Sequence, residues 1–338
     1  MDPRQEQLRD WALQSLAQPA AGSQWTAVAG DASGRRYFRL QLGAASWICV
    51  DTPPATEKNP AFLHIRELLA AAGLPVPQLH AAELERGFLL LQDLGDTLLF
   101  DRLSLASPAH SYDPAFGLLQ TLQGIDGAGS GLELYSAAIL REEFSRFYQW
   151  FCLAWLQLDA GEEDAALVRD FGEMLIDAAS AQPQVLVHRD YHSRNLLVQA
   201  DDSLAIIDFQ DAVIGPLCYD LVSLLRDCYI RWPAAQVRSW ALDYRQRLLS
   251  LGRPAGEDED SFLRWFDWVG LHRHIKVLGN FTRLSLRDGK HGYLSDIPMV
   301  LDYVREVLAA YPELDNFRAW FDTRLQPLIA EQEWVAGA

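Results

Sequence analysis

The sequence predicts an α+β protein of two lobes, an antiparallel sheet followed by a mostly helical region. From Trp25 to Leu91, short runs rich in aromatic and β-branched residues alternate with turns that contain glycine or proline, which is typical of antiparallel strands. Beyond residue 95, apolar residues recur mainly at helical spacing. The chain has 338 residues, 49% of them hydrophobic, which is enough for two lobes. We therefore expect an N-terminal lobe at residues 1–95 and a helical C-terminal lobe at residues 96–338.

The elements of the first lobe follow from local composition. Apolar residues at helical spacing predict a short amphipathic helix over Gln5–Leu16. The runs expected to form the sheet are Trp25–Val28, Tyr37–Leu42, Ser46–Val50, Leu79–Ala82 and Gly87–Leu91. Two prolines indicate a loop over Asp51–Asn59, and the next segment, Pro60–Ala72, is expected to form a helix that ends before Gly73.

The second lobe is predicted to contain one small sheet among helices. Its strands are short apolar runs bounded by polar turns, at Val185–Val187, Leu196–Gln199 and Leu204–Asp208. Later helices are expected over Leu217–Trp232, Ala234–Leu251, Asp260–Leu278, Ile297–Ala310 and Asn316–Glu333. An aromatic stripe at helical spacing is expected in the core: Phe144, Phe147, Tyr148, Phe151 and Trp155.

The charge balance excludes two classes of partner. The chain has 29 Lys and Arg residues against 46 Asp and Glu residues, a net charge of −17. Nucleic acids and anionic membranes both require a cationic face, so neither is expected as a partner. No secretory signal or membrane-spanning stretch is evident, so we expect a cytoplasmic protein, with a monomer favoured. The cysteines lack metal-site spacing and are expected to be buried free thiols: Cys49, Cys152, Cys218 and Cys228.

The residues that carry chemistry lie between positions 185 and 211. His188, Arg189 and Asp190 are followed by Asn195, which reproduces the H-R-D-x-x-x-x-N spacing of a kinase catalytic loop. An alcohol that attacks a phosphate needs a carboxylate within hydrogen-bond reach to orient it and accept its proton. Asp190 is the candidate for this role, and His188 and Arg189 complete the predicted catalytic set.

A pair of oxygen donors in the same segment predicts a metal site. Asp208 stands 13 residues beyond Asn195, at the end of an apolar run. Mg²⁺ prefers oxygen ligands, and a turn between two strands would set an amide and a carboxylate side by side. We therefore predict Asn195 and Asp208 as Mg²⁺ ligands, with ATP as the phosphoryl donor. A lone His-Arg-Asp triplet would be weak evidence, whereas its combination with these two residues is specific.

The wider motif resembles the aminoglycoside phosphotransferase/choline kinase branch of the protein-kinase-like fold. The shared marks are HRDYHSRNLL with His192 inside the loop, Asp-Phe-Gln from Asp208, and Tyr219-Asp220-Leu221 further on. The resemblance implies a bilobal fold, with an antiparallel sheet in the N-lobe and a mostly helical C-lobe. It also implies that Asp220 braces the catalytic loop and is structural.

Two segments of the first lobe are candidates for nucleotide binding. One is a turn between strands, where glycines and a hydroxyl let backbone N–H groups approach phosphate oxygens: Gly30, Ser33, Gly34, Arg35 and Arg36. The other, GFLLLQDLG, resembles the strand-to-hinge segment of the family. There, backbone groups of Gln92, Asp93 and Leu94 would face adenine.

The sequence departs from the family pattern at one position. The lysine that the resemblance implies in the third strand is missing, because Ser46–Asp51 is SWICVD. Candidate replacements are Arg36, Arg39 and Lys58. Glu57 and Glu67 are candidate partners for that cation.

A closer resemblance covers most of the chain. GDASGRRYFRL, the Asp51-Thr-Pro-Pro54 turn and the tail HRHIKVLGNFTRLSLRDGKHGYLSDIPMVLDYV together resemble the anomeric N-acetylmuramate/N-acetylglucosamine kinases of bacterial cell-wall recycling. The resemblance implies ATP-dependent phosphorylation of the C1 hydroxyl of an amino sugar. N-acetylmuramate carries a lactyl carboxylate, which a guanidinium can bind through two hydrogen bonds. Candidate substrate residues are His192, Arg194, Gln210, Asp211, His272, Arg273, Lys276 and Arg283.

Two alternatives stay open at this point. Another small-molecule kinase of the same branch would act on an aminoglycoside, choline or a homoserine-like alcohol, although the basic tail argues against polycationic aminoglycosides. A non-catalytic binding protein with this fold would account for the missing lysine. It would not account for the intact set of Asp190, Asn195 and Asp208.

Overall fold

The computed structural model describes residues 2–28, 34–103 and 112–336. The chain packs as two compact units. The first unit is Met1–Leu122 with Arg194–Asp211, and the second unit is Gln123–Ser193 with Ala212–Ala338. Each unit therefore combines segments that are distant in the sequence. The lobe boundary predicted after residue 95 is a different division of the chain and stays a prediction.

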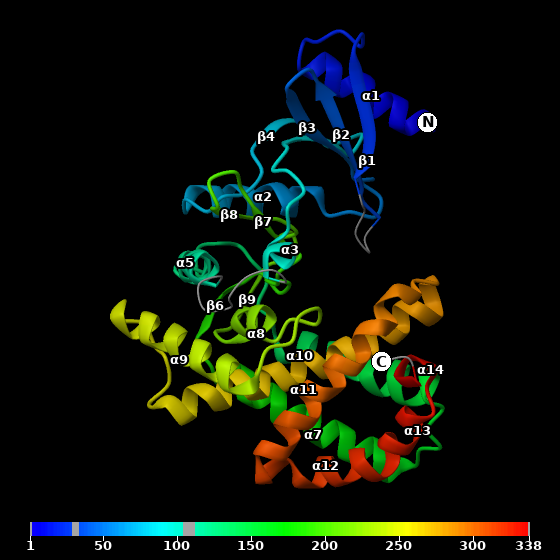
Figure 1. The fold of residues 1–338 in the computed structure, drawn as a ribbon, viewed down its shortest axis with the longest axis vertical. Coiled ribbons are helices and arrows are strands. Elements are labelled where there is room, and N and C mark those ends of the chain that lie inside the picture. The colour runs from blue at the N-terminus through cyan, green and yellow to red at the C-terminus, as the bar shows by residue number, and fades with distance from the viewer. Residues whose placement is uncertain (1, 29–33, 104–111, 337–338) are drawn as a thin grey trace. The chain divides into compact units, whose positions relative to one another are not determined.

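The first unit contains the predicted antiparallel sheet, drawn in blue and cyan in Figure 1. Its strands lie in the order β1-β2-β3-β5-β4, and each is antiparallel to its neighbours. Their bounds are β1 (Ser23–Val28), β2 (Arg36–Leu42), β3 (Ala45–Asp51), β4 (Leu79–Glu83) and β5 (Phe88–Gln92). The turn between β2 and β3 needs Gly43, whose φ of 61° is a conformation that glycine adopts without strain.

Helix α1 (Pro3–Ser15) packs against this sheet through its apolar face. The side chain of Asp2 caps the helix, since its Oδ1 accepts a hydrogen bond from Gln5 N at 2.9 Å. Leu8, Ala12 and Leu13 of the helix share a core with Phe38, Leu40, Cys49, Phe88 and Leu90 of the strands. Burial of these apolar side chains stabilises the position of α1 on the sheet.

The first unit also receives a hairpin from far along the chain. This hairpin consists of β7 (Leu196–Val198) and β8 (Leu204–Ile206). The first unit also contains the helices α2 (Asn59–Ala71), α3 (Leu99–Leu103) and α5 (Asp113–Leu122). Val198 N donates to Thr97 O at 2.8 Å, and Ile206 N donates to Pro75 O at 2.7 Å. These backbone bonds attach the hairpin that carries the predicted metal ligands to the first unit.

Helix α10 (Glu259–Asp288) is central to the second unit (Figure 1). Around it lie α6 (Ala137–Arg146), the π-helix η1 (Phe147–Trp155), α7 (Glu162–Ser180), α8 (Tyr219–Leu225), α9 (Ala234–Ser250) and α11 (Ile297–Ala310). The predicted aromatic stripe lies in the shared core, with Phe144, Phe147 and Phe151 buried. Gly279 lets α10 approach the backbone of the α6–η1 junction, because a Cβ there would lie 2.4 Å from the carbonyl carbon of Arg146.

The prediction of one small sheet in the second lobe is wrong. Among the described residues, the short strands form two separate two-stranded sheets. One pairs β7 with β8, and the other pairs β6 (Gln184–Val187) with β9 (Val213–Pro216). Strand β9 is not among the predicted strands, because Gly215 and Pro216 are residues that usually end a strand.

Three predicted helix boundaries are also wrong. The helix expected over Leu217–Trp232 ends at Leu225, because Asp227 Oδ1 accepts from Tyr229 N at 3.0 Å and turns the chain. Helix α10 continues past the predicted end, Leu278, as far as Asp288. The helix predicted over residues 316–333 is divided into α12 (Asp315–Trp320), η4 (Phe321–Leu325), α13 (Gln326–Ala330) and α14 (Glu333–Ala336). Pro327, which has no N–H to donate, stands at the start of α13.

Candidate active site

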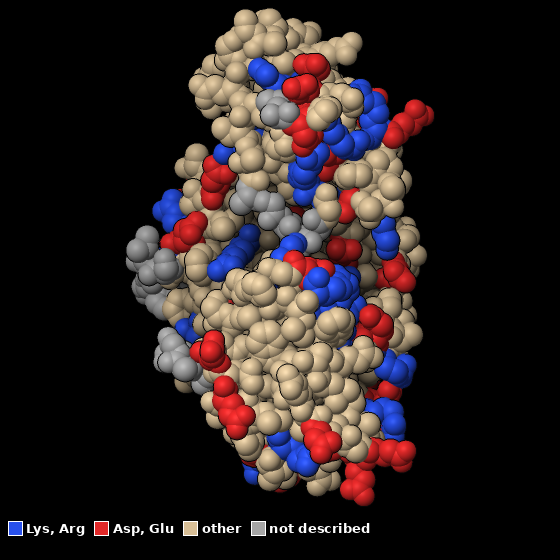
Figure 2. Space-filling model, turned by 90° about the vertical axis from the view of Figure 1, so that its right-hand side faces the viewer, with Lys and Arg blue, Asp and Glu red and all other residues tan. Residues whose placement is uncertain are grey.

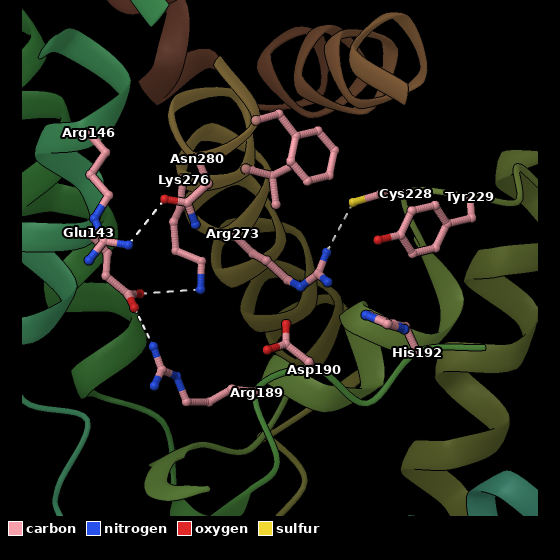
Figure 3. A pocket seen from close by; sticks show the side chains of 12 residues that line it. Glu143, Arg146, Arg189, Asp190, His192, Cys228, Tyr229, Arg273, Lys276 and Asn280 are labelled. Atoms are coloured by element: carbon pink, nitrogen blue, oxygen red, sulfur yellow. Dashed lines mark hydrogen bonds and ion pairs between the residues drawn. The ribbon is translucent and has the colours of Figure 1, made fainter. Parts of the chain in front are cut away.

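A cavity in the second unit contains the predicted catalytic carboxylate (Figure 3). Its volume is about 180 Å³, and its walls come from α6, the loop after β6, the segment after α8, and α10. Its lining includes Glu143, Arg146, Arg189, Asp190, His192, Cys228, Tyr229, Arg273, Lys276 and Asn280. We call it the Asp190 cavity.

A buried aspartate of α8 holds the start of the predicted catalytic loop. Asp220 Oδ2 accepts a hydrogen bond from His188 N at 2.6 Å, and its Oδ1 accepts one from Arg189 N at 3.0 Å. Arg189 takes a φ of 76°, which a residue with a side chain adopts only where its neighbours enforce it. Burial raises the pKa of Asp220 to about 7, although both N–H donors act to lower it. These contacts are the bracing that the family resemblance implies for Asp220.

Glu143 joins the catalytic loop to α10. It is only 2% exposed, and it forms an ion pair with Arg189 and a second one with Lys276, whose Nζ lies 3.3 Å from its Oε2. The hydroxyl group of Tyr135 donates a hydrogen bond to the same carboxylate. Burial alone would raise the pKa of Glu143, but Lys276 and then Arg189 lower it to about 2. The network therefore stays ionised and fixes the head groups of two cavity-lining cations.

Asp190 is ionised because cations surround it. Burial would raise its pKa, but Lys276, His192 and Arg273 lower it below the usual value. An ionised carboxylate can accept a hydrogen bond from a hydroxyl group and then its proton. The side chain therefore has the charge that the predicted role requires.

The histidines of the prediction lie in different surroundings. His188 is buried, and its Nδ1 accepts from the backbone N–H of Asp190 at 3.3 Å, so it orders the loop. His192 lines the Asp190 cavity. His272 does not line it: its Nε2 lies 3.1 Å from Leu140 O, and burial lowers its pKa to about 4. Of these three side chains, His192 is the one placed to meet a ligand.

The other predicted substrate residues are also divided. Arg273 and Lys276 both line the Asp190 cavity from α10, whereas Arg283 on the same helix does not. The remaining three belong to the first unit: Arg194, Gln210 and Asp211. Of the four predicted substrate residues on α10, two therefore line the cavity, namely Arg273 and Lys276.

The predicted metal ligands lie beside each other in the first unit. Asn195 Nδ2 is 3.3 Å from Asp208 Oδ2, at the base of the β7–β8 hairpin. Gln210 Nε2 donates to the other carboxylate oxygen at 2.6 Å. Asp208 takes a φ of 63°, a strained conformation of the kind found at functional sites. An amide oxygen and a carboxylate are donors that suit Mg²⁺.

The predicted phosphate loop is described only in part. Gly30 and Ser33 lie outside the described residues. Gly34 N donates to Glu57 Oε1 at 3.1 Å. Arg35 is buried, and its Nη2 lies 3.4 Å from the other carboxylate oxygen of Glu57. The structure thus forms a buried cation–acid pair next to this loop.

The candidate replacements for the missing lysine differ in their partners. Arg36 and Arg39 each bind two carboxylates, so both guanidinium groups are already neutralised. Those partners are Asp2 and Asp51 for Arg36, and Asp93 and Asp96 for Arg39. Lys58 is exposed, as is Glu67. The pair of Arg35 and Glu57 is therefore the one that most resembles the lysine–glutamate pair that the family resemblance implies.

The predicted hinge is partly hydrogen-bonded within the protein. Gln92 N donates to Gln78 O at 2.8 Å, and Leu94 O accepts from Gln199 Nε2 at 3.2 Å. Asp93 binds Arg39 through its side chain. The adenine-facing role of this segment stays a prediction.

Several residues of the Asp190 cavity are not among the predicted site residues: Glu143, Arg146, Cys228, Tyr229 and Asn280. One signal was available for Glu143. It stands with Leu140, Phe144 and Phe147 on the apolar face of the α6–η1 segment, where a carboxylate needs a buried cationic partner. The partner cations come from elsewhere in the chain, so the sequence could not identify the contact.

Comparison with known proteins places the chain in a family. Residues 24–262 match the family described as "Phosphotransferase enzyme family". An N-acetylmuramate/N-acetylglucosamine kinase of Pseudomonas putida is 39% identical over 345 residues, which cover 100% of this chain and 98% of the relative. A protein of the same name from Neisseria meningitidis serogroup B is 36% identical, over 99% of this chain and 98% of the relative.

Solved structures with low sequence identity share the fold. Choline kinase LicA from Streptococcus pneumoniae superposes with a TM-score of 0.63 at 15% identity, over 91% of this chain and 99% of that one. A GDP complex of aminoglycoside 2′-phosphotransferase-IIIa gives a TM-score of 0.59 at 14% identity, with 91% and 99% coverage. The predicted fold class is thereby confirmed. The chain belongs to the phosphotransferase enzyme family and, within it, to the group that contains these N-acetylmuramate/N-acetylglucosamine kinases.

Proposed function

We propose that the protein transfers the γ-phosphoryl group of ATP to the anomeric hydroxyl of N-acetylmuramate and N-acetylglucosamine. The names of the relatives, which match this chain over nearly its full length, support the choice of substrates. The observation that carries the proposal is the ionised carboxylate of Asp190 in the wall of a cavity lined by hydrogen-bond donors. In this proposal the enzyme acts in the salvage of cell-wall amino sugars.

Asp190 would orient the sugar hydroxyl and accept its proton. Its lowered pKa keeps the carboxylate ionised at neutral pH, so it is ready to accept a hydrogen bond. Asp220, through its hydrogen bonds to the backbone at 188–189, would hold the carboxylate in place. In this assignment His188 and Arg189 are positioning residues for Asp190.

Asn195 and Asp208 would hold Mg²⁺. Their side chains lie within 3.3 Å of each other and offer the hard oxygen donors that this ion prefers. The described residues contain no cluster of three or more His, Cys, Asp and Glu side chains able to hold a metal ion. Such a sparse site suits an ion that takes its other ligands from phosphates and water. When bound, Mg²⁺ would neutralise charge on the phosphates of ATP.

The remaining parts of the proposal concern the nucleotide and the cell. Gly30, Ser33, Gly34, Arg35 and Arg36 are proposed to contact phosphates, and backbone groups of Gln92, Asp93 and Leu94 to contact adenine. A cytoplasmic location and a monomeric state are proposed as well. Within the described residues, no helix has the length and apolar character needed to cross a membrane.

The lining of the Asp190 cavity disfavours the other small-molecule kinases considered above. Its basic side chains outnumber its carboxylates, which does not suit a polycationic aminoglycoside or a quaternary amine such as choline. The presence of Asp190, Asn195 and Asp208 argues against a non-catalytic protein.

The test of the proposal is the substitution Asp190→Asn. It keeps the size of the side chain and removes its ability to accept a proton, so kcat with either sugar should fall at least about 100-fold. Turnover would be followed by ADP release, and ³¹P NMR would identify an anomeric phosphate in the wild-type product. Asp202→Asn is a matched control, because Asp202 is highly exposed in the β7–β8 turn and its φ of 62° suits asparagine. Unchanged turnover by the Asp190 variant would refute the assignment.

A further inference from the structure

The Asp190 cavity carries an excess of basic side chains in a chain whose net charge is −17. Besides His192, four of the described side chains that line it are arginine or lysine: Arg146, Arg189, Arg273 and Lys276. Two are carboxylates: Glu143 and Asp190. All six belong to the second unit, so the balance is a property of one compact unit. Such an excess favours a ligand with negative charge.

Three of the four cations already have a carboxylate partner. Arg189 and Lys276 share Glu143. Arg146 Nη2 lies 2.7 Å from a carboxylate oxygen of Glu142, one helical turn earlier on α6, and its Nη1 donates to Asn280 Oδ1 at 3.1 Å. Arg146 is therefore balanced by Glu142, whereas Arg189 and Lys276 share the single negative charge of Glu143.

Arg273 differs from the other three. It is only 4% exposed, and the single hydrogen bond of its side chain within the described residues runs from Nη1 to Cys228 Sγ at 3.5 Å. A thiol is a weak acceptor. Asp190 interacts with Arg273 electrostatically, but no carboxylate of the described chain lies within ion-pair distance of the guanidinium. A buried guanidinium that has no carboxylate at ion-pair distance can bind an anion from outside the chain.

We propose that Arg273 binds the lactyl carboxylate of N-acetylmuramate and thereby favours this sugar over N-acetylglucosamine, which lacks that group. The proposal rests on the proposed function and adds the residue that distinguishes its two substrates. A guanidinium can donate two parallel hydrogen bonds to one carboxylate. Figure 3 shows Arg273 extending from α10 toward Asp190 and His192. The lactyl group is carried on C3 of the sugar, two ring carbons from the reacting C1 hydroxyl.

The two sugars provide the test, because they differ only in this carboxylate-bearing group. The change Arg273→Met should lower kcat/KM for N-acetylmuramate about 10- to 100-fold, the range expected for a lost charged hydrogen bond. The loss should appear mainly as a higher KM, since the carboxylate takes no part in bond making. Arg273 also lowers the pKa of Asp190, so turnover of N-acetylglucosamine should fall as well, but at least about tenfold less than that of N-acetylmuramate. Arg273→Lys, which keeps the charge without the planar fork, should be intermediate.

Arg146→Met is the matched control. Arg146 lines the same cavity and is already paired with Glu142, so its loss should affect both sugars alike. Equal losses for both sugars in Arg273→Met would overturn the proposal and assign the guanidinium to the transferred phosphoryl group or to the fold. A selective loss in Arg146→Met would overturn it as well.

Thermal unfolding supplies a second measurement that needs no turnover. N-acetylmuramate should raise the Tm of Arg273→Met less than that of the wild type, whereas N-acetylglucosamine should raise both by similar amounts. If N-acetylmuramate raises the Tm of both proteins equally, the proposal is wrong. If the wild type phosphorylates neither sugar, the proposed function fails, and that result is recognised before any variant is measured.

Discussion

Glu143 illustrates how one residue determines the geometry of the site. Its carboxylate is buried and binds Arg189 of the catalytic loop, Lys276 of α10 and the hydroxyl of Tyr135. Buried ion pairs contribute modestly to stability, but removing one partner leaves the others as unpaired buried charges. The structure therefore depends on Glu143 far more than on an exposed carboxylate of the same helix.

We predict that Glu143→Gln lowers the free energy of unfolding by about 3 kcal/mol at pH 7, as measured by urea denaturation. Cations lower the pKa of Glu143 from 4.5 to about 2, so the ionised side chain stabilises the fold above pH 4.5. This contribution is lost as the pH falls from 4.5 toward 2, and the difference between wild type and variant should shrink over that window.

Glu142→Gln is the control for this prediction. Its side chain is 63% exposed and pairs with Arg146 on the surface, so the free energy of unfolding should change by less than about 1 kcal/mol. A difference between wild type and Glu143→Gln that does not depend on pH would contradict the ionised network.

At the scale of elements, the short helix α8 and the segment that follows it hold the predicted catalytic loop at both ends. Asp220 in its first turn binds the backbone at His188 and Arg189. Asp227, two residues after the helix, accepts from Ser193 N at 3.0 Å and from Ser193 Oγ. The loop is thereby fixed on each side of Asp190, and the early end of α8 is a requirement of the site.

We predict that Asp227→Ala lowers both stability and kcat. The change leaves the buried N–H group of Ser193 and that of Tyr229 without their acceptor, which should cost about 2–4 kcal/mol of unfolding free energy. The kcat should fall about tenfold or more with little change in KM, because the loop position matters most in the transition state. Asp227→Asn keeps one acceptor oxygen and should lose less. Hydrogen exchange of the loop amides would test the cause, and unchanged exchange rates would argue against it.

At the scale of the whole molecule, the acidic excess is partly offset by local ion pairs. On the face in Figure 2, acidic and basic side chains lie next to each other at several places. Ion pairs with solvent-accessible partners in the described chain include Arg36 with Asp2, Arg39 with Asp96, and Arg264 with Glu313. Exposed pairs of this kind contribute little each, so repulsion from the net charge of −17 remains the larger effect.

Salt should therefore stabilise the protein. Raising NaCl from about 10 mM to about 150 mM shortens the screening length from about 30 Å to about 8 Å, and we expect the Tm to rise by roughly 2 °C. Differential scanning calorimetry at constant pH would measure this. A fall in Tm would mean that the ion pairs outweigh the overall repulsion.

The fold was predictable where local composition decides it. The strands of the sheet, α2 and α11 follow the sequence pattern closely, because alternating and helical apolar spacing each suit one kind of element. The end of α8 and the strand β9 were not predictable. Helix α8 ends early because Asp227 turns the chain by binding Tyr229 and also holds Ser193. Strand β9 forms by pairing with β6, which begins 29 positions earlier, and local composition does not reveal such a pairing.

By itself the sequence indicated the family, which the comparisons confirm, and predicted a catalytic carboxylate at Asp190 and oxygen donors at Asn195 and Asp208. Motif spacing conveys this because the catalytic loop and the hairpin are short local structures. The tertiary structure alone decided which residues line the Asp190 cavity. It paired Lys276 with Glu143, because α10 packs against α6, more than a hundred residues away in the chain. It also placed Arg273 beside the thiol of Cys228 and without a carboxylate at ion-pair distance.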